Sequence, residues 1–126
     1  MRCLAAARLA SVLVAAASLW LLSGCLSASE TPEDRQAQRG RELLARYHCG
    51  SCHTIPGVAA AQGQVSASLA AYGRRSYIAG RVANETSTLA RWIADPASVV
   101  PGTRMPNMGV SADDARDMAL YLGRLQ

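Results

Sequence analysis

The sequence predicts an all-α fold class: a small domain of about four short helices joined by long loops. Two stretches, near residues 37–47 and 115–125, repeat apolar residues at steps of three and four, which is the spacing of one buried helix face. No segment alternates apolar and polar residues as a strand would, and no internal repeat is present. The stretch between these helices is rich in Gly, Ala and Ser, which favours loops.

The first 24 residues predict a signal peptide rather than part of the folded domain. Arg2 and Arg8 supply a positive start, and residues 9–22 form an apolar run that is too short to span a bilayer comfortably. We therefore expect the chain to be exported from the cytoplasm.

The apolar run is followed by Leu-Ser-Gly-Cys, which resembles the lipobox of bacterial lipoproteins. That resemblance implies cleavage before Cys25 and lipidation of its sulfur; the alternative is a chance cysteine beside an ordinary cleavage site. Residues 1–24 are then a lipoprotein signal peptide, residues 25–31 a lipidated tether, and residues 32–126 the folded domain. Because more than one acyl chain anchors stably, we expect a protein attached to a membrane on the periplasmic side.

The first helix of the domain is expected to begin at Pro32 and to end at the cysteine cluster. Thr31 can cap it, Pro32 suits the first helical position, and Glu33 and Asp34 favour the positive end of its dipole. Its apolar face is predicted to comprise Ala37, Gly40, Leu43, Leu44 and Tyr47.

The rest of the chain predicts long loops and two further helices. Short helical turns are expected around residues 66–72, and a helix is expected from about Ser87 through Ile93, where Pro96 stops its continuation. Residues 99–109, with two prolines and two glycines, are expected to form a loop. Ser111 opens the last helix, whose apolar stripe is Ala115, Met118, Ala119, Leu122 and Leu125, with Tyr121 beside it.

The charge of the chain gives no support for a nucleic-acid partner. The formal net charge is +4, and removal of Arg2 and Arg8 with the signal leaves 11 arginines against nine acidic residues. The chain contains no lysine, so arginine makes every contact of a basic side chain.

The segment Cys49-Gly50-Ser51-Cys52-His53 contains the only two cysteines of the expected domain. C-x-x-C-H is the attachment signature of c-type haem, because one turn presents both sulfurs to the haem vinyl groups and holds the following histidine beneath the iron. A thioredoxin-like dithiol, a structural zinc site and a disulfide are the alternatives. Such a dithiol usually begins a helix beside strands, and zinc needs four converging ligands, neither of which is indicated here. His48 is interpreted as a solvated residue at the helix end.

The core also suggests a cofactor. The expected domain has no Phe and a single Trp, Trp92, and a small domain of short helices and long loops buries little surface, so its stability is expected to be marginal. A low-spin haem needs a second axial ligand, and Met105 lies in the loop Pro-Gly-Thr-Arg-Met-Pro, which can bring a thioether to the iron. The alternatives are Met108 as ligand, or both methionines as ordinary packing.

Three segments, CGSCH, PGTRMP and the closing DARDMALYL, together resemble the class I c-type cytochromes over about residues 33–125. The resemblance implies a small cytochrome c fold wrapped around one covalent haem c. It implies thioether attachment through Cys49 and Cys52, with His53 and Met105 as the axial iron ligands. Gly40 and Tyr121 match a small and an aromatic residue at a helix crossing in that family. The haem pocket is expected to include Trp92, Arg74, Pro101 and Thr103.

The sequence departs from that family at one place. The family commonly has Gly-Pro-x-Leu after the haem histidine, where the proline carbonyl accepts the imidazole Nδ1 hydrogen. Here the same place reads Ser66-Ala67-Ser68-Leu69. The carbonyl of Ala67 can still accept this bond, but the loop loses the rigidity that proline gives.

These features lead us to expect a monohaem electron-transfer protein that carries single electrons and has no enzymatic reaction or small-molecule substrate at the iron. Its expected partners are membrane-bound or periplasmic redox proteins, with a membrane contact through the lipid anchor. Two alternatives are a fixed haem subunit of a periplasmic dehydrogenase or oxidase complex, and a haem gas sensor, which requires an open or labile sixth position.

Overall fold

The computed structural model describes residues 30–126 of the chain. The predicted signal peptide, the proposed lipidation site Cys25 and most of the tether lie outside the described residues. Within residues 30–126, none of the helices combines the length and the apolar character needed to span a bilayer.

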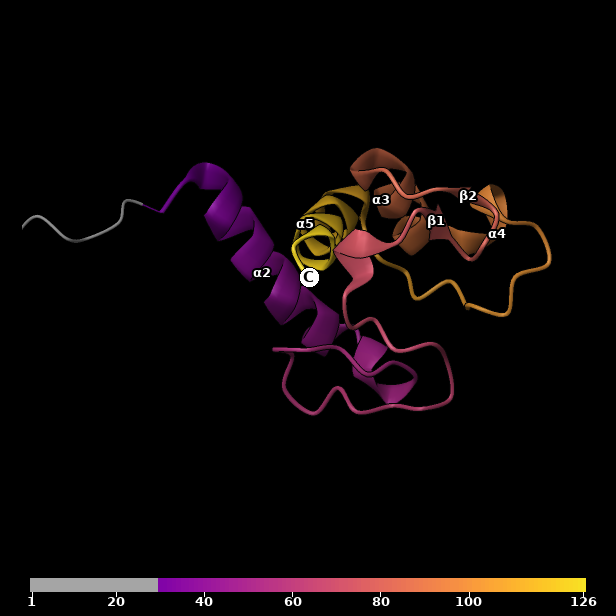
Figure 1. The fold of residues 1–126 in the computed structure, drawn as a ribbon, viewed down its shortest axis with the longest axis horizontal. Helices are drawn as coiled ribbons and strands as arrows, with labels where there is room; N and C mark the ends of the chain where they lie inside the picture. The colour runs from indigo at the N-terminus through magenta and orange to yellow at the C-terminus, as the bar shows by residue number, and fades with distance from the viewer. Residues whose placement is uncertain (1–29) are drawn as a thin grey trace, which may run out of the picture.

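The described residues form four α-helices with long connections, which confirms the predicted fold class (Figure 1). Helix α2 runs diagonally past α5, and the chain beyond its end loops out before it returns to α3. The α-helices are α2 (Pro32–Arg46), α3 (Thr86–Ala94), α4 (Pro96–Val99) and α5 (Ala112–Gly123). The short elements are the 3₁₀ turns η2 (Cys49–Ser51) and η3 (Tyr72–Arg74) and the strands β1 (Tyr77–Ile78) and β2 (Val82–Ala83).

Three details differ from the sequence-based prediction. Strands β1 and β2 pair as a two-residue antiparallel hairpin, although no strand was expected. Pro96 does follow the end of α3, but it also occupies the first turn of α4, where its missing N–H costs nothing. The helical turn expected around residues 66–72 lies later, at η3.

The N-terminus of α2 is closed by the residues that the sequence pointed to. The Thr31 hydroxyl accepts a hydrogen bond from the Asp34 N–H at 3.1 Å, and the Asp34 carboxylate accepts one from the Thr31 N–H at 2.9 Å. This reciprocal pair satisfies two N–H groups that the helix leaves open. The Thr31 hydrogen bonds, with help from Arg124, lower the pKa of Asp34 to about 2.

Helices α2 and α5 cross so closely that their contact requires a glycine. A β-carbon placed on Gly40 would lie 2.0 Å from the carbonyl oxygen of Asp117 in α5. Beside this crossing, the Asp117 carboxylate is buried, with 3% of its side chain exposed, and pairs with Arg39 of α2. The predicted packing role of Gly40 therefore has a direct steric basis.

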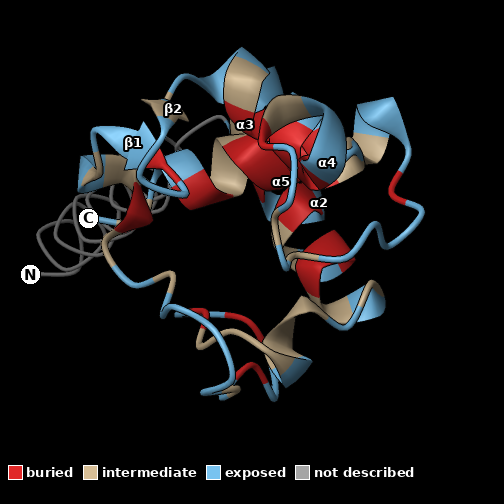
Figure 2. Ribbon diagram, turned by 90° about the vertical axis from the view of Figure 1, so that its right-hand side faces the viewer, coloured by how far each residue is buried: buried red, intermediate tan, exposed pale blue. Residues whose placement is uncertain are grey.

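The core lies where α2, α3 and α5 meet, as the red segments of Figure 2 show. The apolar stripe predicted for α5 is buried from Ala115 to Leu122, and Leu125 is half-buried. Most of the chain between residues 56 and 71 is exposed by comparison. The helices thus supply one packed wall, and the loops form the other side of the molecule.

Candidate functional site

A cavity of about 540 Å³ brings the predicted ligand residues together. This volume is in the range of about 300–1,000 Å³ that is usual for cofactor and small-molecule sites. Its walls come from the end of α2, the loop after it, α3, α5 and the loop before α5. The predicted site residues that line it are Cys49, Cys52, His53, Trp92, Thr103 and Met105.

The two cysteines lie on a tight turn directly after α2. His48 adopts a left-handed conformation, with φ of 55°, and its carbonyl accepts a hydrogen bond from the Ser51 hydroxyl at 2.7 Å. The turn packs closely on the following loop: a β-carbon on Gly50 would lie 2.5 Å from the α-carbon of Ala61. Small residues between the cysteines therefore let the loop close over the turn while both sulfurs border the cavity.

The Cys49 thiol differs from the reactive thiol of a redox dithiol. Both are free, and burial raises the pKa of the Cys49 thiol. A redox dithiol instead has a lowered pKa, commonly at the N-terminus of a helix. Across residues 30–126, no group of three or more His, Cys, Asp or Glu side chains is placed to hold a metal ion. His48, which was interpreted as a solvated residue at the helix end, is exposed at the cavity wall.

His53 is oriented by the carbonyl group that the sequence indicated. Its Nδ1 lies 2.7 Å from the Ala67 carbonyl oxygen. Since a carbonyl oxygen only accepts, Nδ1 carries the proton of this contact, which leaves Nε2 as the ring nitrogen that could bind a metal. The hydrogen-bonded carbonyl also fixes the ring plane and makes the imidazole a stronger electron donor.

Met105 approaches the same cavity from the loop before α5. It is half-buried against the core, and its N–H donates to the Thr103 hydroxyl at 3.2 Å. Met108 also lines the cavity but is 44% exposed. Met105 is therefore the more buried of the two methionines, and its role as an iron ligand stays a prediction.

The wall of the cavity differs from the sequence-based prediction at two residues. Trp92 is buried and Thr103 half-buried in the wall, but Arg74 and Pro101 are exposed and lie outside the lining. Arg75 lines the cavity in place of its neighbour Arg74. Two adjacent arginines cannot be told apart by sequence spacing alone, since a single turn decides which one faces inward.

Tyr121 connects the helices to the ligand loop. Its hydroxyl donates to the Pro56 carbonyl at 2.6 Å, three residues beyond His53, and burial raises its pKa. The nearest α5 atoms to Gly40 belong instead to Asp117 and Met118, one turn earlier. Gly40 and Tyr121 thus act at neighbouring points of the same helix contact.

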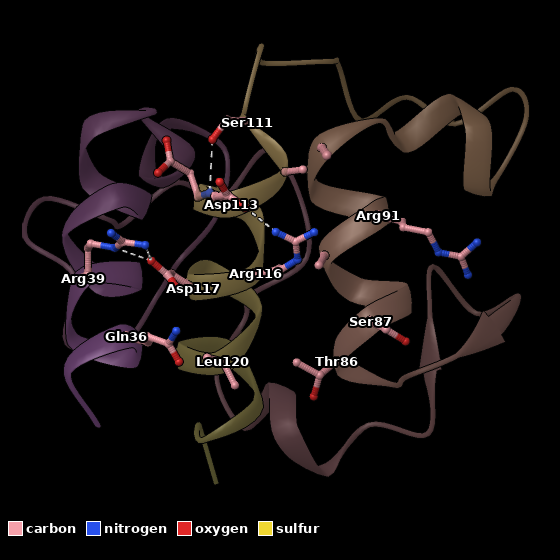
Figure 3. A pocket seen from close by; sticks show the side chains of 14 residues that line it. Gln36, Arg39, Thr86, Ser87, Arg91, Ser111, Asp113, Arg116, Asp117 and Leu120 are labelled. Carbon is pink, nitrogen blue, oxygen red and sulfur yellow. Dashed lines mark hydrogen bonds and ion pairs between the residues drawn. The ribbon is translucent and has the colours of Figure 1, made fainter. Parts of the chain in front are cut away.

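A second and larger groove, of about 1030 Å³, lies between α2, α3 and α5. Figure 3 shows that it contains the ion pairs Arg39–Asp117 and Arg116–Asp113, and its three arginines are matched by three aspartates. None of the residues predicted for the site lines it. No histidine, cysteine or methionine lines it, and its carboxylates are not grouped to hold a metal ion, so size alone does not make it the candidate site.

The residues around the smaller cavity fit a covalently attached haem. Two free thiols, an imidazole with its Nε2 available and a thioether border one largely apolar space. Thiols at this spacing can form both thioether bonds, and imidazole with thioether is a known axial pair for haem iron. Among the residues that sequence reasoning missed are Tyr72 and Val65; nothing in their local sequence indicates that the loops bring them to the cavity.

Comparison with known proteins agrees with this chemistry. The family model for cytochrome c matches residues 37–126. Cytochrome c oxidase subunit 2 of Alkalihalophilus pseudofirmus is 30% identical over 83% of this chain, and that of Bacillus subtilis is 32% identical over 72%. The matched segments cover only 30% and 26% of those relatives, so the chain spans less than a third of their length. No solved structure is significantly similar. The chain belongs to the cytochrome c family, whose cofactor is covalently attached haem c.

Proposed function

We propose that the protein is a lipid-anchored monohaem cytochrome that carries single electrons between membrane-associated redox partners outside the cytoplasm. The observation that carries this proposal is the convergence of Cys49, Cys52, His53 and Met105 on one cavity of a cytochrome c domain. When bound, haem c supplies an iron that gains and loses one electron.

Each residue of such a site would have its own role. Cys49 and Cys52 would hold the group covalently, and His53 and Met105 would both bind its iron, which would leave no open position for a small-molecule substrate. Trp92 and the apolar wall would exclude water, which reduces the solvent reorganisation that accompanies a change of charge in the site. Two filled positions favour electron transfer over gas binding.

The mouth of the cavity has the character of a docking surface for a redox partner. Two of the three large hydrophobic side chains exposed in residues 30–126, Val65 and Met108, line it. No acidic residue lies among its lining residues, and none occurs in residues 43–84 or 96–112, which build the surrounding loops. Arg104, exposed beside Met105, forms no ion pair within the described chain. An apolar patch with one free guanidinium suits a small, transient contact with an uncharged or weakly acidic surface.

The relatives favour a cytochrome c oxidase as the electron acceptor. Because the alignment with the Alkalihalophilus protein takes 83% of this chain, it includes most of the cytochrome c domain. A similar domain thus occurs within an oxidase subunit, and the same observation supports a second candidate, a fixed haem subunit of an oxidase complex. Purification of the mature protein from native membranes separates the two. A stable stoichiometric complex supports the fixed subunit, and a protein that separates at moderate salt supports the mobile carrier.

Met105, the proposed second iron ligand, provides the test of the electron-transfer proposal. In the ferric protein, a methionine–iron absorption band is expected, and Met105→Ala should abolish it and open the site to carbon monoxide in the ferrous form. Met108→Ala is the matched control and should keep the band. A wild-type protein that is high-spin and binds carbon monoxide readily would contradict the carrier and favour a gas sensor.

The lipid anchor is tested separately. We expect metabolic labelling with a fatty acid to mark the wild-type protein and not Cys25→Ala. If a Cys25→Ala protein exported by another signal supports respiration as well as the anchored form does, attachment to the membrane has no part in the function.

A further inference from the structure

The loop that orients His53 is exposed to solvent. The residues from Gln64 to Ser68 are all exposed, yet the Ala67 carbonyl among them accepts the hydrogen bond from His53. Backbone bonds hold this stretch at two points on either side of Ala67: Ser66 N–H donates to the Cys52 carbonyl at 3.0 Å, and Leu69 N–H donates to the Thr54 carbonyl at 2.8 Å. An alanine in the middle does not restrict the backbone as a proline would.

A side chain from outside this stretch adds a third contact beside Ala67. The Arg75 guanidinium donates through Nη2 to the carbonyl of Ser68, the residue after Ala67. The same guanidinium lies over the Tyr72 ring, with its Cζ 5.1 Å from the ring centroid, and Tyr72 is only 5% exposed. A planar guanidinium can donate in its own plane while it stacks on an aromatic face, which an ammonium group does less well.

Arg75 is itself fixed in place by the structure behind it. The Asn84 side chain donates to the Arg75 carbonyl at 2.9 Å and to the Tyr72 carbonyl at 3.3 Å. The Arg75 N–H donates to the Tyr72 carbonyl at 3.1 Å. The guanidinium therefore extends from a rigid turn, and its bond to Ser68 limits the motion of the adjacent Ala67 carbonyl.

We propose that Arg75 is a positioning residue for His53 and thereby sets the reduction potential of the protein. This inference rests on the proposed role of His53 as an axial ligand. The hydrogen bond from Nδ1 to the Ala67 carbonyl makes the imidazole more basic and favours the oxidised state, which lowers the potential. A loop released from Arg75 holds this bond less well, so the potential should rise.

The sign of the potential shift separates this role from a direct charge effect. We expect Arg75→Gln to raise the midpoint potential of the holoprotein. If Arg75 acted only as a positive charge beside the cofactor, its removal would favour the more positive, oxidised state and lower the potential. Arg74→Gln is the matched control, because Arg74 is the exposed neighbour outside the cavity lining and should leave the potential unchanged. A lower potential in Arg75→Gln, or the same shift in both variants, overturns the proposal.

A second substitution tests the route through the loop. Ala67→Pro should restore rigidity, since the Ala67 N–H donates to no backbone acceptor in the described residues and its φ is not positive. In the Arg75→Gln background, Ala67→Pro is expected to return the potential toward the wild-type value. Failure of this rescue contradicts the proposed route.

Proton exchange at His53 gives a readout that does not depend on electron transfer. By NMR of the ferrous protein, we expect the Nδ1 proton of His53 to exchange with solvent about fivefold faster in Arg75→Gln, as for the loss of one net hydrogen bond. Unchanged exchange overturns the proposal. If Arg75→Gln fails to acquire haem, Arg75→Lys keeps the charge without the planar stack and should show the same two changes to a smaller extent. If Arg75→Gln shifts the potential as expected but the wild-type protein exchanges electrons with no partner, the proposed function is refuted. The positioning role of Arg75 then still stands.

Discussion

The helical side and the loop side of this domain are held together by different kinds of interaction. At the crossing of α2 and α5, apolar side chains interlock and the buried Asp117 carboxylate pairs with Arg39. The loop after α2 contributes three buried apolar residues, Ile55, Val58 and Ala61, and is otherwise held by backbone hydrogen bonds, such as those from Gly63 N–H to the Gly50 carbonyl and from Leu69 N–H to the Thr54 carbonyl. The helical side can therefore form from its own packing, whereas the loop side depends more on the group it encloses.

The largest effect is expected when the loop side loses its covalent attachment. A Cys49→Ala, Cys52→Ala double variant should lose all covalently bound haem, because no other cysteine lies in residues 30–126. Haem staining after denaturing electrophoresis measures this directly. His48→Ala is the control and should stain as the wild type does. Staining of the double variant would show that attachment uses other residues.

On the helical side, the most damaging small change is Gly40→Ala. The added methyl group would lie 2.0 Å from the Asp117 carbonyl oxygen, so the two helices must move apart. We expect the free energy of unfolding to fall by about 1–3 kcal/mol, measured by guanidinium denaturation. Gly123→Ala, where the new methyl group has no atom within 4 Å, should not destabilise the protein. Equal stability of the two variants would mean that the crossing is not tightly packed.

Tyr121→Phe removes the hydrogen bond that joins the helical side to the loop side but leaves the aromatic ring in place. The lost bond from the hydroxyl to the Pro56 carbonyl should lower the free energy of unfolding by about 1 kcal/mol. Hydrogen exchange should quicken in the loop after His53 more than in α2 or α5. A uniform change across the molecule would indicate that the two sides unfold as one unit. Tyr77→Phe, at an exposed residue of the hairpin, is the matched control.

The smallest expected effect is on the stability of the first turn of α2 at low pH. The Thr31 hydrogen bonds hold the pKa of Asp34 at about 2, below its ordinary value of 3.8. The stabilisation is therefore complete above about pH 4 and is lost as the pH falls toward 2. Asp34→Asn should flatten this part of the stability–pH curve, measured by denaturation at several pH values. A curve unchanged in the variant would assign the acid sensitivity to other carboxylates.

The helices and the haem attachment were predictable because their signals are local. Thr31 and Ser111 cap the helices as their sequence positions suggest, and the two cysteines and His53 lie within one turn. The loop wall was less predictable, because backbone bonds between distant residues leave no pattern in the side chains. The hairpin was missed because each strand has only two residues, and its turn depends on Ala79 and Gly80 at positive φ.

The capping box at Thr31 also fixes where α2 begins, and so fixes the length of helix before the cysteines. It fixes the first turn of α2, and the helix then runs 15 residues, or about 22 Å, before the turn that carries Cys49 and Cys52. If Cys25 carries lipid as proposed, α2 would lie along the chain between the membrane attachment and the redox site. Its length would act as a spacer that sets how far above the bilayer the cavity can meet a partner, so insertion of helical turns into α2 would change which partners are within reach.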